Sequence, residues 1–354
     1  MYLGLKEMWH EKLRYGLLSG VLLLIALVVF MLSGLANGLS VGNRQAVDQW
    51  RAKTVYLNKN ANQSLAASQL KISDQTTVSG THAPLANLSG TLRTTTNKLK
   101  TSASAFGTSR DSFIMPKVIK GHRINGKDQL LISAGLLDKG YHLGQKVRIG
   151  TTTHSVKIVG TYQTSTYSIA PTVYTDTSTL NRLKGSPITS GKDQPINAIV
   201  AKNSQFKSSD HDNLERLSIT TFVSSLPGYS AEQLTLNTMI YFLFVMALAV
   251  IGIFMFVLTL QKSALFGVLK VQGIGTRHII GALLSQSIAM ALIGIGLGLA
   301  ITIGLAQIMP AGLPFVIDWN AFGIYSVALL AAAVIGALLS WRTVANIDPA
   351  VAIG

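Results

Sequence analysis

The most suggestive chemical motif in this 354-residue chain is an eight-residue segment with the spacing of a phosphate-binding loop. It reads Gly121-His122-Arg123-Ile124-Asn125-Gly126-Lys127-Asp128. The match ends at its last position, where Asp128 replaces the Ser or Thr that holds magnesium and would repel phosphate. No strand-to-helix context follows, and Asn125-Gly126 is typical of a hairpin turn. We therefore interpret the segment as a turn and expect no nucleotide site.

Other side chains that carry chemistry are scattered or missing. The chain has no cysteine, which excludes disulfides, thiolate metal sites and thiol nucleophiles. Its seven histidines are dispersed, and no pair has the spacing of metal ligands on one helix. The abundant serines include one Gly-x-Ser-x-Gly spacing, Gly38-Leu39-Ser40-Val41-Gly42, which lies at the end of the first charge-free segment. We expect a non-catalytic chain with no metal site and no bound cofactor.

The distribution of charge identifies the elements that must position the functional residues. Charged types make up 13% of the chain and hydrophobic types 48%, whereas a soluble domain has about 25% charged residues. Four segments of 29, 29, 40 and 23 residues contain no Asp, Glu, Lys or Arg; they are 15–43, 233–261, 278–317 and 319–341. A membrane-spanning helix needs about 20 apolar residues. The sequence thus predicts an integral membrane protein with a large polar insertion.

We expect a membrane α-helical fold of four transmembrane helices, with an α+β extracellular domain inserted between helices 1 and 2. The expected segments are an amphipathic N-terminal helix (1–16), transmembrane helix 1 (17–43), the extracellular domain (44–230), transmembrane helix 2 (231–260), a cytoplasmic segment (261–278), transmembrane helix 3 (279–308), an external turn (309–320), transmembrane helix 4 (321–341) and a cytoplasmic tail (342–354). A cleaved signal peptide is the alternative for the first span. We favour an uncleaved helix because its apolar stretch is long and Glu7 and Glu11 precede it.

Lys and Arg in the short loops set the orientation. The N-terminal segment is basic, and the loop between spans two and three has three basic residues and no acid, whereas the turn between spans three and four has only Asp318. We predict a multi-pass cell-membrane protein with both termini in the cytoplasm. The insertion 44–230 then lies outside, with 23 of the 30 Lys/Arg and 10 of the 15 Asp/Glu, a net charge of +13. We expect it to lie near anionic lipid or wall polymer, and expect no nucleic acid.

Two parts of the insertion differ in pattern. Residues 60–112 are rich in Ser, Thr, Ala, Asn and Gln with weak periodicity, which predicts helix and loop. Residues 113–175 contain short β-type runs separated by glycines, which predicts strands and turns. In the third span, Gly294 and Gly298 form a GxxxG spacing that permits close helix approach. We expect it to pack spans three and four together, which leaves the contact between subunits to spans one and two.

Residues 261–281 resemble the cytoplasmic coupling segment of the FtsX/MacB family of ABC transporter permeases. The matching elements are Phe266-Gly267-Val268-Leu269-Lys270, the turn at Gly273 and a helix beginning near Thr276. The tail with Asp348-Pro349 is similar to the family's ending, and residues 131–174 resemble the MacB-type external core domain. In one departure, Ala264-Leu265-Phe266 precede Gly267 where many members have an acid. The resemblance covers nearly the whole chain and matches the order of its spans.

The resemblance implies a homodimeric permease subunit that works with two copies of a separate ABC ATPase subunit. The residues implied to couple to that ATPase are Lys262, Leu265, Phe266, Gly267, Leu269, Lys270 and Gly273. Helical spacing independently brings four side chains to one face: Leu265, Val268, Leu269 and Gln272. We expect Lys262 and Lys270 to meet acids of the partner. A re-entrant turn at the lipid interface is the alternative, which spacing alone does not exclude.

Within the family, the small size, the start at 5–16 and the segment 226–233 are most similar to haem-exporter permeases of Gram-positive bacteria. This implies haem as a transported substrate, with Met31 and Glu232 as candidate ligands, because a thioether and a carboxylate both bind haem iron. Each has an ordinary alternative. Met31 can be core packing, and Ser230 to Gln233 form a capping box with Glu232 in the first helical turn.

We therefore expect haem efflux from the membrane. Export of a peptide, drug or lipid-linked substrate is a rival of the same class. Transmission of a signal to an external cell-wall hydrolase is a rival of another class, and a membrane receptor without any ATPase is a third.

Overall fold

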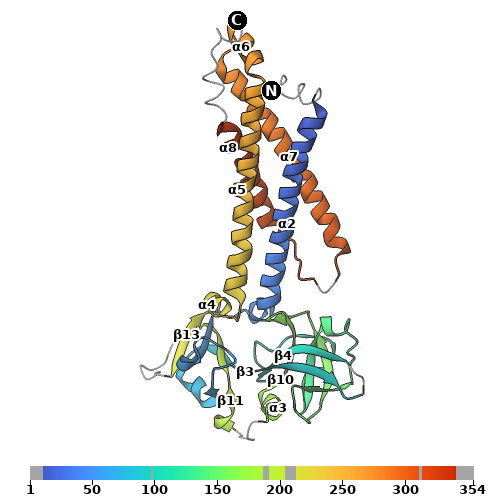
Figure 1. Ribbon diagram of the computed structural model, residues 1–354. Helices are drawn as coiled ribbons and strands as arrows, with labels where there is room; N and C mark the ends of the chain where they lie inside the picture. Colours follow the sequence, from blue (N-terminus) through green and yellow to red (C-terminus); the bar gives the residue numbers. More distant parts are fainter. Residues whose placement is uncertain (1–10, 97–98, 186–190, 204–212, 311–312, 340–354) are drawn as a thin grey trace. The chain divides into compact units, whose positions relative to one another are not determined.

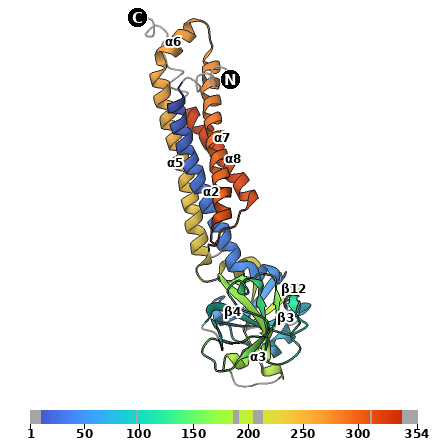
Figure 2. The same ribbon diagram turned by 90° about the vertical axis from the view of Figure 1, so that its right-hand side faces the viewer.

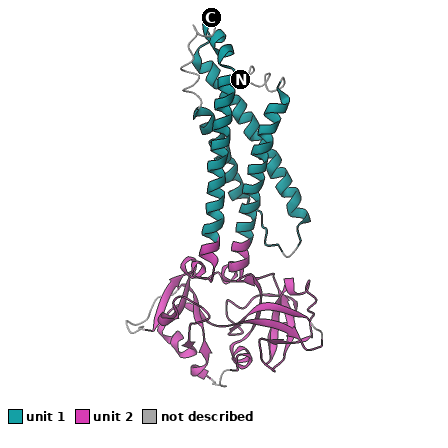
Figure 3. Cartoon of the chain, in the orientation of Figure 1, with its two compact units in different colours: residues 1–38, 233–354 teal, residues 39–232 magenta. Residues whose placement is uncertain are grey.

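The computed structural model describes residues 11–96, 99–185, 191–203, 213–310 and 313–339. The chain is shown in Figures 1 and 2, and Figure 3 colours its two compact units. Unit 1 comprises residues 1–38 and 233–354, and unit 2 comprises residues 39–232. The surface helix expected over residues 1–10 and the tail expected over 342–354 lie outside the described residues.

Within the described residues, four helices are long and apolar enough to cross a membrane, by length and composition. They are α2 (Lys12–Gln49), α5 (Tyr229–Gln261), α7 (Thr276–Ile308) and α8 (Trp319–Leu339). The short helix α6 (Ser263–Val271) lies between α5 and α7 in the chain. The predicted fold class is confirmed: four candidate transmembrane helices, with an α+β domain inserted between the first and the second.

Helix α2 begins earlier than the sequence indicated. The sequence predicts a separate amphipathic helix that includes residues 12–16, but these residues form the N-terminal end of α2. The segment contains no proline, and its one glycine, Gly16, is isolated and is tolerated inside the helix. Residues 12–16 and the first span therefore belong to one continuous helix.

The helices of unit 1 share one apolar core. Phe30 of α2 contacts Phe322 of α8 with ring centroids 5.0 Å apart. The segment before α8 lies along α2, where the Val316 N–H donates to the Gly34 carbonyl at 3.0 Å and Asn37 Nδ2 donates to the Val316 carbonyl at 3.1 Å. These contacts fix α8 and the segment before it against the first span.

Helix α7 packs against α8 as expected, where the Ser287 hydroxyl donates to the Ala333 carbonyl at 2.9 Å, but the GxxxG face of α7 contacts α2 and not α8. A Cβ atom added at Gly294 would lie 2.8 Å from Leu22 Cβ, and one at Gly298 would lie 3.0 Å from Ala26 Cβ. Helix α8 instead uses Gly336, where an added Cβ would lie 2.9 Å from the Leu248 carbonyl oxygen of α5. A glycine spacing indicates close approach but does not encode which helix approaches.

Unit 2 is built on a β-sheet. Among its described residues, eleven strands form one sheet with the central order β13-β1-β12-β3-β4-β10-β6-β8-β5, while β7 pairs with β3 and β8, and β9 pairs with β10. The strands are β1 (Thr54–Asn58), β3 (Thr81–Thr94), β4 (Lys100–Thr108), β5 (Val118–Gly121), β6 (Gln129–Ser133), β7 (Lys146–Ile149), β8 (Val156–Tyr162), β9 (Thr166–Tyr167), β10 (Ala170–Asp176), β12 (Ala198–Asn203) and β13 (Leu214–Ser218). A two-stranded sheet joins β2 (Leu70–Lys71) to β11 (Pro195–Ile196).

The helix and loop expected over residues 60–112 are wrong for Thr81–Thr94 and Lys100–Thr108, which are strands β3 and β4, and for the short strand β2. Strands β3 and β4 pair antiparallel there, at the centre of the sheet. They are rich in small residues because helix α3 (Thr177–Leu183) packs closely on them, and a Cβ at Gly107 would lie 2.8 Å from Leu180 Cβ. Because many buried residues of β3 and β4 are small, apolar and polar side chains do not alternate clearly along them. The sequence pattern therefore did not indicate strands.

An aromatic cluster holds the last turn of α2 to the sheet within unit 2. Trp50 meets Phe106 edge-on with centroids 5.5 Å apart, and Trp50 Nε1 donates to the Tyr174 hydroxyl at 2.8 Å. Tyr162 meets Tyr174 edge-on at 5.4 Å. Helix α4 (Ile219–Ser224) adds Phe222 to the same core.

Candidate functional site

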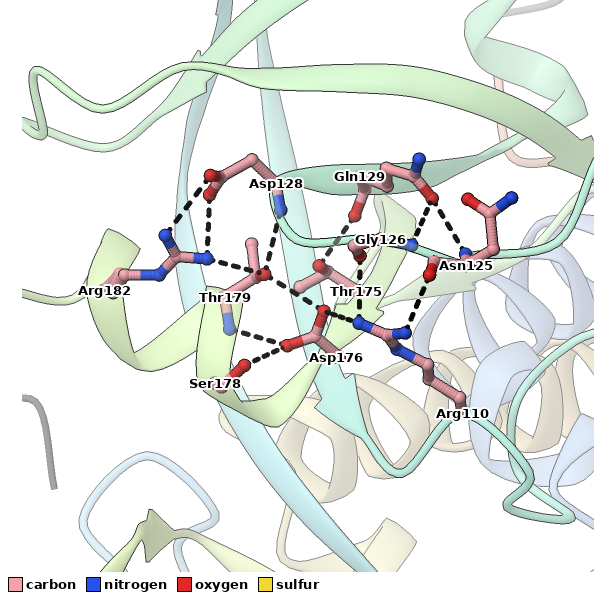
Figure 4. A network of polar contacts seen from close by, with 10 residues as sticks. All are labelled: Arg110, Asn125, Gly126, Asp128, Gln129, Thr175, Asp176, Ser178, Thr179 and Arg182. Carbon is pink, nitrogen blue, oxygen red and sulfur yellow. Dashed lines mark hydrogen bonds and ion pairs between the residues drawn. The ribbon is translucent and has the colours of Figure 1, made fainter. Parts of the chain in front are cut away.

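The segment with phosphate-loop spacing is a loop in which the N–H groups of Asn125, Gly126 and Asp128 are already bonded (Figure 4). Gln129 Oε1 accepts from the N–H groups of Asn125 at 2.8 Å and Gly126 at 3.1 Å. Asp128 forms an ion pair with Arg182, with 3.0 Å between Oδ1 and Nη2. A phosphate would find a carboxylate and occupied donors, so the geometry supports a turn.

The loop is not the hairpin that the Asn-Gly pair indicated. Strands β5 and β6 flank it, but each pairs with β8 and not with the other. Asp128, with φ of +59°, makes the tight change of direction before β6. The Asn-Gly signal found the turn but not the strand pairing, which the sheet determines.

Asp176 joins this loop to helix α3. Its carboxylate caps the helix by accepting from the Thr179 N–H at 2.8 Å and the Thr179 hydroxyl at 3.0 Å. The Arg110 guanidinium lies 3.6 Å from the same carboxylate and donates to the carbonyls of Asn125 and Gly126 at 3.0 Å each. Figure 4 shows these groups bonded to one another, an arrangement that serves structure.

The segment between α5 and α7 contains the short helix α6, which has one buried and one exposed apolar face. Phe266 and Gly267 are buried in the core of unit 1, and Leu269 packs against that core. The exposed side chains are Leu265 (50% exposed), Val268 (41%) and Val271 (54%). We call these three residues the apolar ridge of α6. Three apolar side chains at helical spacing form a surface that a protein groove can cover.

Gly273 ends this helix as the sequence indicated. Its φ of +85° is a left-handed conformation that favours glycine. The Gly273 N–H donates to the Lys270 carbonyl at 3.0 Å, and the Ile274 N–H donates to the Leu269 carbonyl at 3.0 Å. The tight turn lets α7 begin at Thr276.

The structure places Lys262 differently from the prediction that it forms an ion pair with an acidic residue of a partner protein. Only 8% of it is exposed, and its ammonium nitrogen lies 3.6 Å from Glu11 Oε1 and 3.5 Å from the Tyr15 hydroxyl. The Tyr15 hydroxyl in turn donates to Gln286 Oε1 of α7 at 3.2 Å. The acid that Lys262 meets therefore belongs to its own chain. We call Glu11, Tyr15, Lys262 and Gln286 the buried polar cluster.

Both halves of the chain match known families. Residues 17–217 match the MacB-like periplasmic core domain, and residues 237–349 match the FtsX-like permease C-terminal region. The chain belongs to the FtsX/MacB family of ABC transporter permeases.

Relatives of this permease match it over its full length. A Staphylococcus haemolyticus protein named as a hemin transport system permease, HrtB, is 28% identical over 354 residues, covering 100% of this chain and 99% of the relative. An ABC transporter permease of Mycobacterium bovis is 26% identical over 368 residues, with the same coverage. Among solved structures, the periplasmic region of MacB from Actinobacillus actinomycetemcomitans is 16% identical, with a TM-score of 0.36, and covers 51% of this chain and 94% of that one.

The two candidate haem ligands lie in different units of the permease. Met31 is half-buried on α2 in unit 1. Glu232 lies in the first turn of α5 in unit 2, where its Oε2 accepts from Asn43 Nδ2 at 3.3 Å. Nearby in unit 2, the hydroxyls of Ser40 and Tyr229 lie 2.9 Å apart. The Glu232 carboxylate is thus bonded to Asn43 of α2.

The capping box expected at the start of α5 is wrong. The helix begins at Tyr229, so Ser230 lies inside its first turn, and the Ser230 hydroxyl donates to the Ser224 carbonyl. The Glu232 N–H bonds to the Gly228 carbonyl at 2.9 Å. Glu232 does lie in the first turn of α5, where the helix dipole favours a carboxylate, so this part of the ordinary alternative agrees with the structure.

Sequence reasoning missed the other members of the buried polar cluster. Tyr15 and Gln286 were treated as ordinary residues of apolar segments. The available signal was Gln286 itself, an amide in a 40-residue charge-free stretch, because polar side chains within membrane spans pair with one another.

Proposed function

We propose that this permease is the membrane subunit of a haem exporter, which works as a homodimer with two copies of a separate ABC ATPase and has both termini in the cytoplasm. The full-length similarity to proteins named as hemin transport permeases supports haem as substrate. The basic loop around α6 supports the orientation, because cytoplasmic loops of membrane proteins are enriched in Lys and Arg.

The observation that carries the coupling role is the apolar ridge of α6. Leu265, Val268 and Val271 expose apolar surface on a helix whose opposite face is buried. The ATPase binds this ridge in a groove. When ATP draws the two ATPase subunits together, α6 moves with them and shifts α5 and α7, which flank it in the chain.

Haem leaves from the outer leaflet of the membrane in this proposal. Met31 supplies a thioether and Glu232 a carboxylate, both of which bind haem iron. No hydrolytic group is needed in the permease, since the ATPase provides the energy and the permease provides the path. Haem is cargo and not a resident cofactor.

Haem tolerance of growing cells tests the proposal. A strain that lacks the permease receives the native gene, the Glu232→Gln variant or the Asp318→Asn variant, together with the ATPase gene. Asp318 caps α8, where asparagine caps equally well, so Asp318→Asn is the matched control. We expect tolerance from the native gene and the control and its loss with Glu232→Gln.

Two results would contradict the proposal at different levels. Full tolerance with both Met31→Ala and Glu232→Gln removes these residues from the haem path. No effect of the native gene on haem tolerance rejects haem as the substrate. Stable capture of a cell-wall hydrolase in that second case would favour the signalling alternative.

A further inference from the structure

The hairpin turn between β9 and β10 contains an unusual pair of residues. Tyr167 pairs with Ala170 across it, so the turn consists of Ser168 and Ile169 alone. Both have a positive φ, of +49° and +65° respectively. Two-residue hairpin turns with positive φ at both positions strongly prefer Asn-Gly or Asp-Gly. Here a β-branched residue occupies the position that glycine usually takes.

Burial in the core does not account for an isoleucine at this strained position, because the Ile169 side chain is 51% exposed. A β-branched residue with positive φ is a backbone outlier that costs free energy. Among the described residues of unit 2, Ile119 and Leu143 are the only other large apolar side chains that are exposed. An exposed apolar side chain kept on a strained backbone points to a contact outside the chain.

The residues before the turn follow α2 step by step. Gln49 Nε2 of α2 donates to the Thr164 carbonyl at 2.9 Å. Four residues earlier in α2, Gln45 Oε1 accepts from the Thr166 hydroxyl at 3.1 Å. As the segment advances toward the turn, its contacts on α2 therefore move back toward the apolar part of that helix.

The turn itself lies beside the end of the first span. The Ser168 N–H donates to the Asn43 carbonyl at 3.1 Å, and the Ile169 N–H donates to the Gly42 carbonyl at 3.0 Å. Asn43 is the last of the 29 residues in the charge-free segment 15–43. As a helix this segment is about 43 Å long, which matches the thickness of a bilayer with its headgroups, about 40–45 Å. The turn is therefore at the depth of the lipid headgroups.

We propose that the Ser168-Ile169 turn enters the headgroup layer on the side of unit 2, where the Ile169 side chain anchors unit 2 to lipid. Moving an exposed apolar side chain from water to the boundary of the acyl chains is favourable. This gain offsets the strain of the turn. Because the residues before the turn are bonded to α2, the anchor also sets the depth at which α2 leaves the bilayer. The proposal depends on neither haem nor the ATPase.

A single introduced cysteine tests this proposal cleanly, since the native chain has none. Ile169→Cys is labelled with the fluorophore NBD in the full-length permease, which is then placed in phosphatidylcholine nanodiscs. A nitroxide on the lipid headgroup quenches a label at headgroup depth, whereas iodide quenches a label in water. Ile119→Cys and Leu143→Cys are the matched controls, because they replace the other exposed large apolar side chains described in unit 2.

We expect the headgroup nitroxide to quench the label of Ile169→Cys several times more strongly than either control label. Iodide should give the reverse order. Ile169→Asn separates lipid contact from folding, because asparagine adopts a positive φ readily and its side chain is polar. The unfolding midpoint of this variant in detergent should match or exceed that of the native permease.

The same quenching by both agents at all three labelled positions would overturn the proposal. So would a much lower unfolding midpoint for Ile169→Asn, since the isoleucine side chain would then serve packing within the chain. Rapid disulfide formation between two copies of Ile169→Cys, with no quenching by the headgroup nitroxide, would also overturn it. That result would assign the turn to a contact between subunits.

Discussion

The ammonium nitrogen of Lys262 lies 3.6 Å from a carboxylate oxygen of Glu11, 251 positions earlier in the chain. Lys262 is the residue between α5 and α6, and Glu11 directly precedes α2. Through the Tyr15 hydroxyl, the same group of contacts reaches Gln286 of α7. The start of α6 is thereby fixed to two other spans. A force on α6 would therefore reach α2 and α7 as well as α5.

Reversing the charge at Lys262 should disrupt this cluster. We expect Lys262→Glu to lower the stability of the purified permease by about 1–3 kcal/mol, because two carboxylates then face each other with little solvent around one of them. The double variant Glu11→Lys/Lys262→Glu restores opposite charges and should recover part of the loss. Thermal unfolding in detergent measures both. The exposed Arg277→Glu is the control, and equal midpoints for Lys262→Glu and this control would contradict the role of the cluster.

Gly294 should tolerate no side chain. A Cβ there would lie 2.8 Å from Leu22 Cβ and 3.0 Å from the Leu23 nitrogen, so Gly294→Ala must push α7 away from α2. We expect a loss of about 1–3 kcal/mol. Gly296, two residues further along α7, has open space at its Cβ position, so Gly296→Ala is the matched control and should change little. Similar unfolding midpoints for the two variants would show that α7 and α2 are not in close contact.

Substitutions on the exposed and the buried face of α6 should affect ATPase binding and folding separately. Leu265→Asp changes the exposed ridge and should abolish co-purification of the ATPase while leaving the unfolding midpoint of the permease unchanged. Phe266→Ala empties a buried site and should lower the stability by about 3–5 kcal/mol. Pull-down with the tagged ATPase and thermal unfolding measure the two effects. Full ATPase binding by Leu265→Asp would reject the ridge as the docking surface.

Lys184 should give unit 2 a specific dependence of stability on pH. Burial lowers the pKa of Lys184 from 10.5 to about 8. Between these values the unfolded chain binds more protons than the folded chain, so this residue makes stability rise as the pH increases from 8 to 10.5. Below pH 8 the lysine is charged in both states and its contribution is constant. Lys184→Met should remove this rise, which paired unfolding curves at pH 7.5 and 9.5 detect. If the stability of Lys184→Met differed between pH 7.5 and pH 9.5 as much as that of the native permease does, the lowered pKa of Lys184 would be contradicted.

The one-dimensional pattern of apolar residues was sufficient to predict the spans. Bilayer thickness fixes the length of a spanning helix, so long segments without charge identify it regardless of the helix's neighbours. The turn at Gly273 was likewise predictable, because a positive φ favours glycine locally. The strands β3 and β4 were not, since their small residues suit the close packing of α3 and their local pattern does not alternate clearly.

The sequence by itself determined where the apolar segments and the turns lie, and which family the chain resembles. Apolar segments, turns and family motifs are each made of residues near one another in the chain. Only the tertiary structure decided that Lys262 pairs with Glu11, that Gly294 meets α2, and that Trp50 bonds to Tyr174. Each of these contacts joins residues far apart in sequence. Their pairing depends on how whole helices and strands pack, which local spacing does not specify.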